Sequence, residues 1–177
     1  MNIARWTLLV DREDTFEVGQ CLGTLLLNPQ MPRVIAAIGN LGAGKTSLAQ
    51  GIARGLGVPS SVYVNSPTFA LHQAHQGQLT FHHLDLYRLM DEEELTYLGF
   101  EEVLEHGVSY IEWPQRAPNL LAATPHLKVE LFYFDEWTSD TEDSSDPLPE
   151  DGRILSIRGP KNEVLTLTDD PRWSTSL

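Results

Sequence analysis

The sequence predicts an α/β fold with a central, mostly parallel sheet, helices on the faces of that sheet and antiparallel additions. A run of apolar residues typical of a buried strand, 34–38, leads through a glycine-rich loop into an amphipathic helix. Further apolar strand segments are separated by helical segments along the chain. A length of 177 residues suits one core rather than two. We therefore expect a single domain over residues 1–177.

The remaining elements can be predicted in order from the N-terminus. A strand at 5–10 precedes a helix that Asp14 and Glu17 would cap and that reaches about Leu27. The helix after the glycine-rich loop stops at Gly57. The later expected elements are a strand at 79–86, a short helix capped by Asp91 and Glu94 and ended by Gly99, a helix at 100–106 closed by Gly107, and strands at 108–112, 127–134 and 153–158.

Residues 39–46 read Gly-Asn-Leu-Gly-Ala-Gly-Lys-Thr, which is a complete phosphate-binding loop. In such a loop Lys45 would reach the β- and γ-phosphates and the Thr46 hydroxyl would ligate Mg²⁺. A turn that merely joins a strand to a helix would need neither residue. The pattern predicts the P-loop NTPase fold, and ATP is favoured over GTP because no Asn-Lys-x-Asp motif is visible. The residues expected to hold the nucleotide here are Gly39, Asn40, Leu41, Gly42, Ala43, Gly44, Lys45, Thr46 and Ser47.

Two acids at the ends of predicted strands are candidates for the magnesium side of this site. Asp85 follows the run 79–84, and Glu112 follows the run 108–111. Ligands of α/β sheets bind at the carboxyl ends of parallel strands, and Mg²⁺ accepts one or two carboxylates beside phosphate oxygens. We expect both acids to face the γ-phosphate and one of them to orient the attacking water. The alternative is that they are surface caps or salt-bridge partners.

Several other residues are less specific candidates for a role in this site. Thr68, which follows a proline, is either a switch residue that senses the γ-phosphate or part of a plain turn. Arg88 either neutralises phosphoryl charge or pairs with an acid, and Trp113 either packs in the core or shapes the nucleotide pocket. The histidines at 72, 75, 82 and 83 do not indicate zinc, because no cysteine accompanies them.

Charge and composition limit the expected partners. A net charge of −13, from 25 acids and 12 Lys plus Arg, argues against direct binding of nucleic acid. Eight of the acids lie in 135–151 without a base, which leaves a net charge of −5 for the rest. We expect this segment to be a solvated insertion, with docking of a basic partner as the alternative. We also expect Cys21 to be packed in a helix, a poorly ordered tail from about 160, no membrane association and a cytoplasmic location.

Four motifs together resemble the TsaE family, also called YjeE. They are the loop 39–46, Ser66-Pro-Thr-Phe69, His83-x-Asp-x-Tyr-Arg88 and Ile111-Glu-Trp-Pro114, in the order and approximate spacing of that family. The resemblance implies a bacterial ATPase that uses ATP and Mg²⁺ and works with TsaD and TsaB in making threonylcarbamoyladenosine in tRNA. It implies no transfer of the threonylcarbamoyl group by this chain itself.

The resemblance also implies roles for single residues. Asn40 departs from the aspartate that the family commonly has, and the insertion at 135–151 is longer than typical. The implied roles are Lys45 as phosphate ligand, Thr46 and Glu112 on the metal, Asp85 as catalytic or metal-linked acid, Thr68 as switch, Trp113 beside the nucleotide, Thr15 and Glu17 near the base, and Arg153 as a further nucleotide contact.

Two other functions stay open at this point. A small-molecule kinase would use the same loop, although the sequence has no arginine-rich lid for an acceptor. A regulatory module would bind ATP without hydrolysing it.

Overall fold

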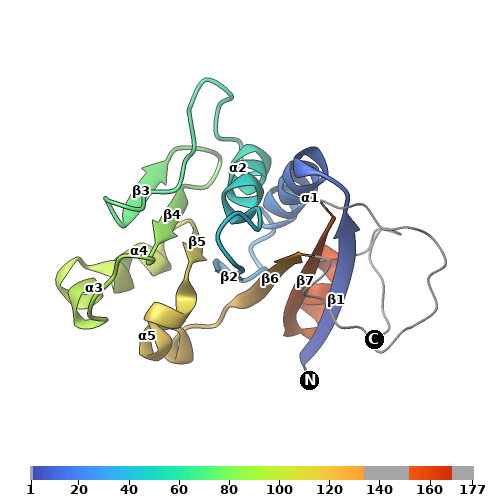
Figure 1. Ribbon diagram of the computed structural model, residues 1–177. Helices are drawn as coiled ribbons and strands as arrows, with labels where there is room; N and C mark the ends of the chain where they lie inside the picture. The colour runs from blue at the N-terminus through green and yellow to red at the C-terminus, as the bar shows by residue number, and fades with distance from the viewer. Residues whose placement is uncertain (1, 134–151, 169–177) are drawn as a thin grey trace.

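The computed structural model describes residues 2–133 and 152–168. The predicted insertion at 135–151 and the end of the chain lie outside the described residues. Within them, one sheet has the strand order β1-β7-β6-β2-β5-β4-β3 (Figure 1). The strands are β1 (Asn2–Leu9), β2 (Val34–Ile38), β3 (His72–His75), β4 (Phe81–Asp85), β5 (Val108–Glu112), β6 (Leu127–Tyr133) and β7 (Arg153–Pro160).

The centre of the sheet is parallel and both of its edges are antiparallel. Strand β2 pairs in parallel with β5 and β6, and β4 pairs in parallel with β5. The β1–β7, β6–β7 and β3–β4 pairs are antiparallel. The predicted α/β fold is therefore confirmed. The helices are α1 (Arg12–Leu25), α2 (Lys45–Gly55), α3 (Glu93–Tyr97), α4 (Phe100–Glu105), α5 (Pro118–Ala123) and α6 (Lys161–Leu167), with a 3₁₀ turn η1 (Pro114–Arg116).

The central strands bury both faces, and this divides the core in two. Successive residues of a strand point to opposite faces. Tyr110 accordingly joins the cluster under α1 and α2, while its neighbour Ile111 joins a second cluster with residues of α3 and α4. Both side chains are completely buried. This explains why β2 is a continuous apolar run in the sequence and β5 a largely apolar one.

Helices α1 and α2 lie side by side and touch through their main chains (Figure 1). A Cβ atom added to Gly51 would lie 2.2 Å from the carbonyl oxygen of Phe16, and one added to Gly19 would lie 2.6 Å from that of Leu48. Gly23 and Gly55 repeat the arrangement one turn further along. Only glycine allows such a close approach. Helix α1 thereby fixes the helix that follows the phosphate-binding loop.

Several sequence predictions need correction. Helix α1 is capped by Asp11, which accepts a hydrogen bond from the Asp14 main-chain nitrogen at 3.0 Å, so the helix begins three residues earlier than expected. Cys21 is exposed, since the buried face of α1 carries residues such as Val18 and Leu22. The chain after 160 begins with α6, which the fully buried Val164 holds against the sheet, rather than with a disordered tail.

Three further elements, β3, η1 and α5, were not predicted from the sequence. The N-terminal strand begins earlier than the predicted 5–10, and β4 is shorter than the predicted 79–86. Across the described residues, no helix combines the length and the apolar character needed to span a membrane.

Candidate nucleotide-binding site

A cavity of about 350 Å³ lies at the carboxyl ends of β4 and β5, beside the start of α2. Residues from four separate parts of the sequence line it, and all four motifs of the sequence analysis contribute. Parallel strands that end at one edge bring such distant segments together. The lining residues are Leu41, Gly42, Gly44, Lys45, Thr46, Ser47, Ser66, Thr68, Asp85, Tyr87, Glu112 and Trp113.

The phosphate-binding loop connects β2 to α2 as predicted. Gly44 has φ of 104°, a left-handed conformation that glycine adopts without strain, and its carbonyl accepts the first bond of α2 from Leu48 at 3.0 Å. The N–H groups of the first turn have no partner within the helix and lie at its positive end. The start of α2 is therefore suited to an anion.

Lys45, the first residue of α2, is buried with only 4% of its surface exposed. Its Nζ donates to the carbonyl oxygens of Gly39 at 2.7 Å and Asn40 at 2.9 Å, and lies 4.5 Å from the ring centroid of Trp113. Burial lowers the pKa of Lys45, and the Glu112 and Asp85 carboxylates oppose this effect. The ammonium therefore lies where a phosphate would be strongly attracted.

Glu112 is held by two side chains. Its Oε1 accepts a hydrogen bond from the Thr46 hydroxyl at 3.2 Å and lies 2.9 Å from Nε2 of His83. Both Glu112 and His83 are buried, at 3% and 0% exposed. Tyr110 adds a bond from its hydroxyl to the Lys45 carbonyl at 2.9 Å. This network joins the last residue of β5 to the first turn of α2.

Our interpretation of the sequence gave His83 no role of its own, although a signal was present. His83 lies two residues before Asp85, so the two-residue period of a strand puts both side chains on the same face.

Asp85 anchors the Ser-Pro-Thr-Phe segment. Its Oδ2 accepts hydrogen bonds from the hydroxyls of Thr68, at 2.8 Å, and Ser66, and its Oδ1 accepts the main-chain N–H of Tyr87 at 3.0 Å. Only 3% of Asp85 is exposed. Asp85 and Glu112 are paired in register on the neighbouring strands β4 and β5. Both acids are therefore buried at one edge of the sheet, where surface caps would not lie.

Two non-glycine residues in the described chain have a left-handed backbone, and both border the site. They are Trp113, with φ of 58°, and Leu71, with φ of 61°. Trp113 directly follows Glu112, and its ring packs 5.0 Å from that of Tyr87. Such conformations cluster at functional sites. Trp113 thus lies at the cavity rather than deep in a core.

The remaining candidates lie around the cavity without lining it. Thr15 is buried and donates its hydroxyl to the Asp11 carbonyl at 3.1 Å, while its methyl group faces Gly44. Arg153 begins β7 near the same glycine, with its guanidinium 5.0 Å from the Tyr133 ring. Ala43 is a buried residue of the loop itself, and Glu17 is exposed on α1. The Arg88 guanidinium lies 4.2 Å from the Phe69 ring.

The oxygen atoms in the cavity suit a hard cation. Mg²⁺ prefers carboxylate and hydroxyl oxygens together with phosphate and water, and Thr46, Asp85 and Glu112 offer such a set. The histidines on β3 and β4 form a different arrangement, in which His72 Nε2 lies 3.0 Å from His82 Nδ1. Throughout the described chain, no three His, Cys, Asp or Glu side chains are grouped as metal ligands.

The fold, with a glycine-rich loop between a central parallel strand and a buried-lysine helix, defines the class of P-loop α/β proteins. A more specific assignment comes from the family model described as "Threonylcarbamoyl adenosine biosynthesis protein TsaE", which matches residues 9–140. The chain belongs to the TsaE family.

Relatives with curated names agree with this assignment. The chain is 36% identical over 141 residues to the tRNA threonylcarbamoyladenosine biosynthesis protein TsaE of Nostoc sp., covering 76% of this chain and 82% of the relative. It is 39% identical over 118 residues to the protein of the same name from Synechocystis sp., covering 63% and 71%. The crystal structure of Bacillus subtilis YdiB has the same fold, with a TM-score of 0.64, 21% identity and coverage of 96% and 94%.

Proposed function

We propose that this protein binds ATP with Mg²⁺ in the cavity at the start of α2, hydrolyses it, and thereby supports the formation of threonylcarbamoyladenosine in tRNA. One observation carries the proposal: Lys45, Thr46 and the paired acids at the ends of β4 and β5 line the same cavity. Membership of the TsaE family supports the part of the proposal that concerns threonylcarbamoyladenosine biosynthesis. We propose that the protein works in the cytoplasm with TsaD and TsaB.

Binding follows from the charges of the loop. The polyphosphate lies across the N-terminus of α2, where main-chain N–H groups and the helix dipole favour negative charge. Lys45 exchanges its two carbonyl partners in the loop for the β- and γ-phosphate oxygens. Thr46, Glu112 and Asp85 would hold Mg²⁺, which would supply positive charge to neutralise the phosphate oxygens.

Hydrolysis depends on positioning and electrostatics, because phosphoryl transfer needs little covalent chemistry from the protein. Asp85 or Glu112 orients the attacking water, and Lys45 stabilises the charge that develops. His83 keeps the Glu112 carboxylate in place. Thr68, which bonds to Asp85, connects the Ser-Pro-Thr-Phe segment to the state of the site.

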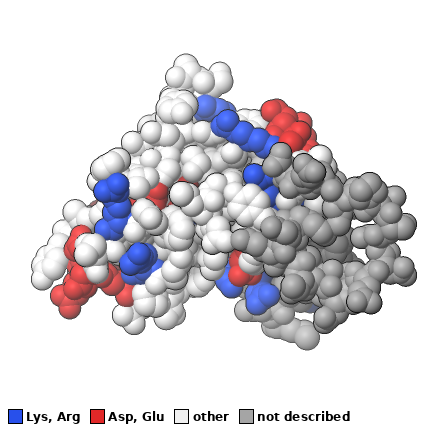
Figure 2. Space-filling view, in the orientation of Figure 1, with Lys and Arg blue, Asp and Glu red and all other residues white. Residues whose placement is uncertain are grey.

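The partners complete the activity. We expect slow hydrolysis by the isolated protein and faster turnover, or a changed nucleotide affinity, when TsaD and TsaB are present. The partners also handle the tRNA, since this chain has a net charge of −13. On the face shown in Figure 2, the described Lys and Arg side chains form separate small groups rather than the continuous stripe typical of RNA binding.

Calorimetry with ATP and Mg²⁺ tests the binding step. We expect saturable binding by the unaltered protein and its loss in Lys45→Ala, while Lys128→Ala, on β6 and away from the cavity, binds normally. Hydrolysis is then measured with and without TsaD and TsaB. Absence of ATP binding by folded protein, alone and with these partners, would overturn the proposal. Phosphate transfer to a nucleoside or sugar would favour a kinase, and binding without ADP formation a regulatory module.

A further inference from the structure

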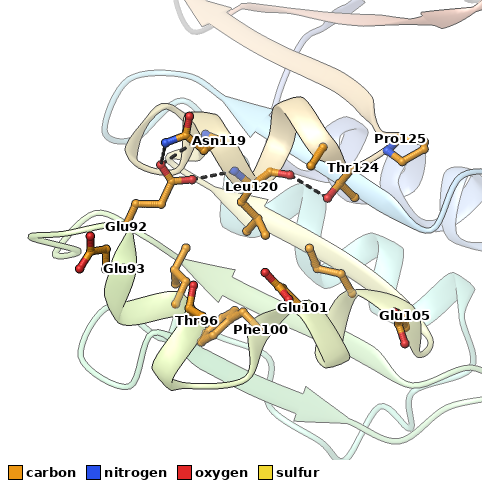
Figure 3. A pocket seen from close by; sticks show the side chains of 13 residues that line it. Glu92, Glu93, Thr96, Phe100, Glu101, Glu105, Asn119, Leu120, Thr124 and Pro125 are labelled. Carbon is orange, nitrogen blue, oxygen red and sulfur yellow. Dashed lines mark hydrogen bonds between the residues drawn. The ribbon is translucent and has the colours of Figure 1, made fainter.

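A second and larger cavity, of about 640 Å³, lies away from the phosphate-binding loop (Figure 3). Helices α3 and α4 form one of its walls, and α5 with the residues that follow forms the other. It shares no lining residue with the nucleotide cavity. We call it the α3–α5 groove.

A side chain at the start of one wall forms hydrogen bonds with the other wall. Glu92, just before α3, accepts a hydrogen bond from the Leu120 main-chain nitrogen at 2.7 Å and another from Nδ2 of Asn119 at 3.0 Å. Figure 3 shows this carboxylate closing one end of the groove. These bonds tie the two walls together at one end of the groove.

The floor of the groove is apolar. Leu95, Phe100 and Leu104 contribute to it and belong to the core cluster on this face of the sheet. A site for a small metabolite normally has a few buried polar groups that converge on the ligand. The polar residues that line this groove, such as Thr96 and Asn119, are exposed or only half-buried instead. The shape and lining suit a segment of protein chain better than a metabolite.

The rim of the groove is strongly acidic. Residues 91–105 contain seven acids and no Lys or Arg, and the lining of the groove has no basic residue. Glu93, Glu101 and Glu105 are exposed, and Figure 3 shows Glu101 pointing into the space between the walls. Figure 2 shows the acidic side chains gathered at the lower left, where Figure 1 places α3.

This charge is local rather than general. Apart from residues 91–105 and the insertion at 135–151, the chain has ten acids and 12 Lys plus Arg. The negative charge of the chain is therefore concentrated in two segments, and the one at 91–105 lies beside an apolar floor. Such a combination favours a partner with the opposite charge and its own apolar side chains.

We propose that the α3–α5 groove binds a short segment of another protein that carries Lys or Arg beside large apolar side chains. The apolar side chains would contact the half-buried Leu120 and the exposed Ala123 and Pro125 above the buried floor, and the cations would face Glu101 and Glu105. This is an interaction surface separate from the nucleotide site, and its occupation does not depend on ATP.

Selection from a library of random 12-residue peptides, displayed on phage and panned on the full-length protein, tests the proposal. Ala123→Arg, which places a bulky cation in the groove wall, serves for counter-selection. Ala122→Arg is the matched control, since this neighbouring residue is exposed and does not line the groove. We expect sequences that combine two or more large apolar residues with Lys or Arg, retained by Ala122→Arg and lost on Ala123→Arg.

One selected peptide is then synthesised and its affinity measured by fluorescence anisotropy. Exposed charge pairs are worth about 0.2–1 kcal/mol each, so the double substitution Glu101→Gln, Glu105→Gln should weaken binding by roughly 2- to 30-fold, and less at high salt. Glu102→Gln removes one charge, half of the change in the double variant, from an exposed residue outside the groove and should change the affinity by less than about twofold.

Three results would overturn the proposal. The selected peptides could be neutral or acidic, or no peptide could depend on position 123. Sedimentation could also reveal a dimer that Ala123→Arg dissociates, and a second copy of the chain would then be the occupant. Circular dichroism of each variant ensures that any loss of binding comes from the groove and not from unfolding.

Discussion

Gly51 is one of the positions where a single added methyl group should disturb the packing of α1 against α2. A Cβ atom there would lie 2.2 Å from the Phe16 carbonyl oxygen and 2.9 Å from the Gln20 main-chain nitrogen. Both are main-chain atoms of α1, so no side-chain rotation can relieve the contact. Ordinary contact begins near 3.4 Å, and the two helices would therefore have to separate by about 1 Å.

Two opposing effects decide the size of the change. Alanine favours a helix over glycine by about 1 kcal/mol, which would stabilise the variant. Overpacking of an interior costs about 1–3 kcal/mol, and a gap of about 1 Å forfeits up to half of the dispersion energy of the contacts that it opens. Leu48 and Ile52, both fully buried on α2, would lose such contacts. We expect Gly51→Ala to lower the free energy of unfolding by about 2 kcal/mol.

Urea unfolding followed by circular dichroism measures this difference. Gln20→Ala, an exposed substitution on α1, is the control and should stay within about 0.5 kcal/mol of the unaltered protein. A Gly51→Ala variant as stable as the parent, or more stable, would refute the packing argument. It would mean that helix propensity outweighs the main-chain contact.

Three other predictions concern the acids, the lysine and the histidines. Asp85→Ala should reduce ATP hydrolysis at least tenfold while changing the Kd for ATP less, and the reverse order would show that its role is misassigned. Burial lowers the pKa of Lys45, so ATP affinity should fall as pH rises through a value below 10.5, whereas Lys45→Arg should keep a flat profile. Burial also lowers the pKa of His75 and His82, so the unfolded chain binds more protons than the fold below about pH 6.5. Stability should be complete above that pH and fall as the pH decreases. Urea titrations at pH 7.5 and 5.5 should show a smaller loss after both are changed to Gln than after the control His126→Gln, which is not among the groups that shift the pKa of His75 or His82.

The central strands could be predicted accurately because their signal is local. The bounds of β2 and β5 agree with the runs 34–38 and 108–112, since strands buried on both faces are largely apolar. Strand β3 has the mostly polar sequence His-Gln-Ala-His and exists through its pairing with β4, which no local pattern announces. Helix α6 likewise depends on the burial of Val164 against the sheet.

The candidate site likewise has one part that could be predicted from the sequence and one part that could not. The phosphate-binding loop is a contiguous motif, so the position of Lys45 followed from the sequence alone. The bonds of Asp85 to the Ser-Pro-Thr-Phe segment and of Glu112 to His83 depend on the register of β4 against β5. Register is set by the whole sheet. From the sequence alone, Gly51 is a residue that weakens a helix. The structure shows that α1 approaches α2 so closely at this position that a side chain would not fit.

The backbone of Trp113 has an energetic consequence. A left-handed conformation costs a residue other than glycine about 1–2 kcal/mol, and an aromatic ring beside an ammonium returns about 0.5–2 kcal/mol. These two contributions nearly cancel, so the contact with the Lys45 ammonium offsets the backbone strain at the end of β5. What the indole does provide is a hydrophobic cover that keeps solvent away from the cation at the start of α2. The ring therefore shapes the surroundings of the Lys45 ammonium as well as the packing at this edge of the sheet.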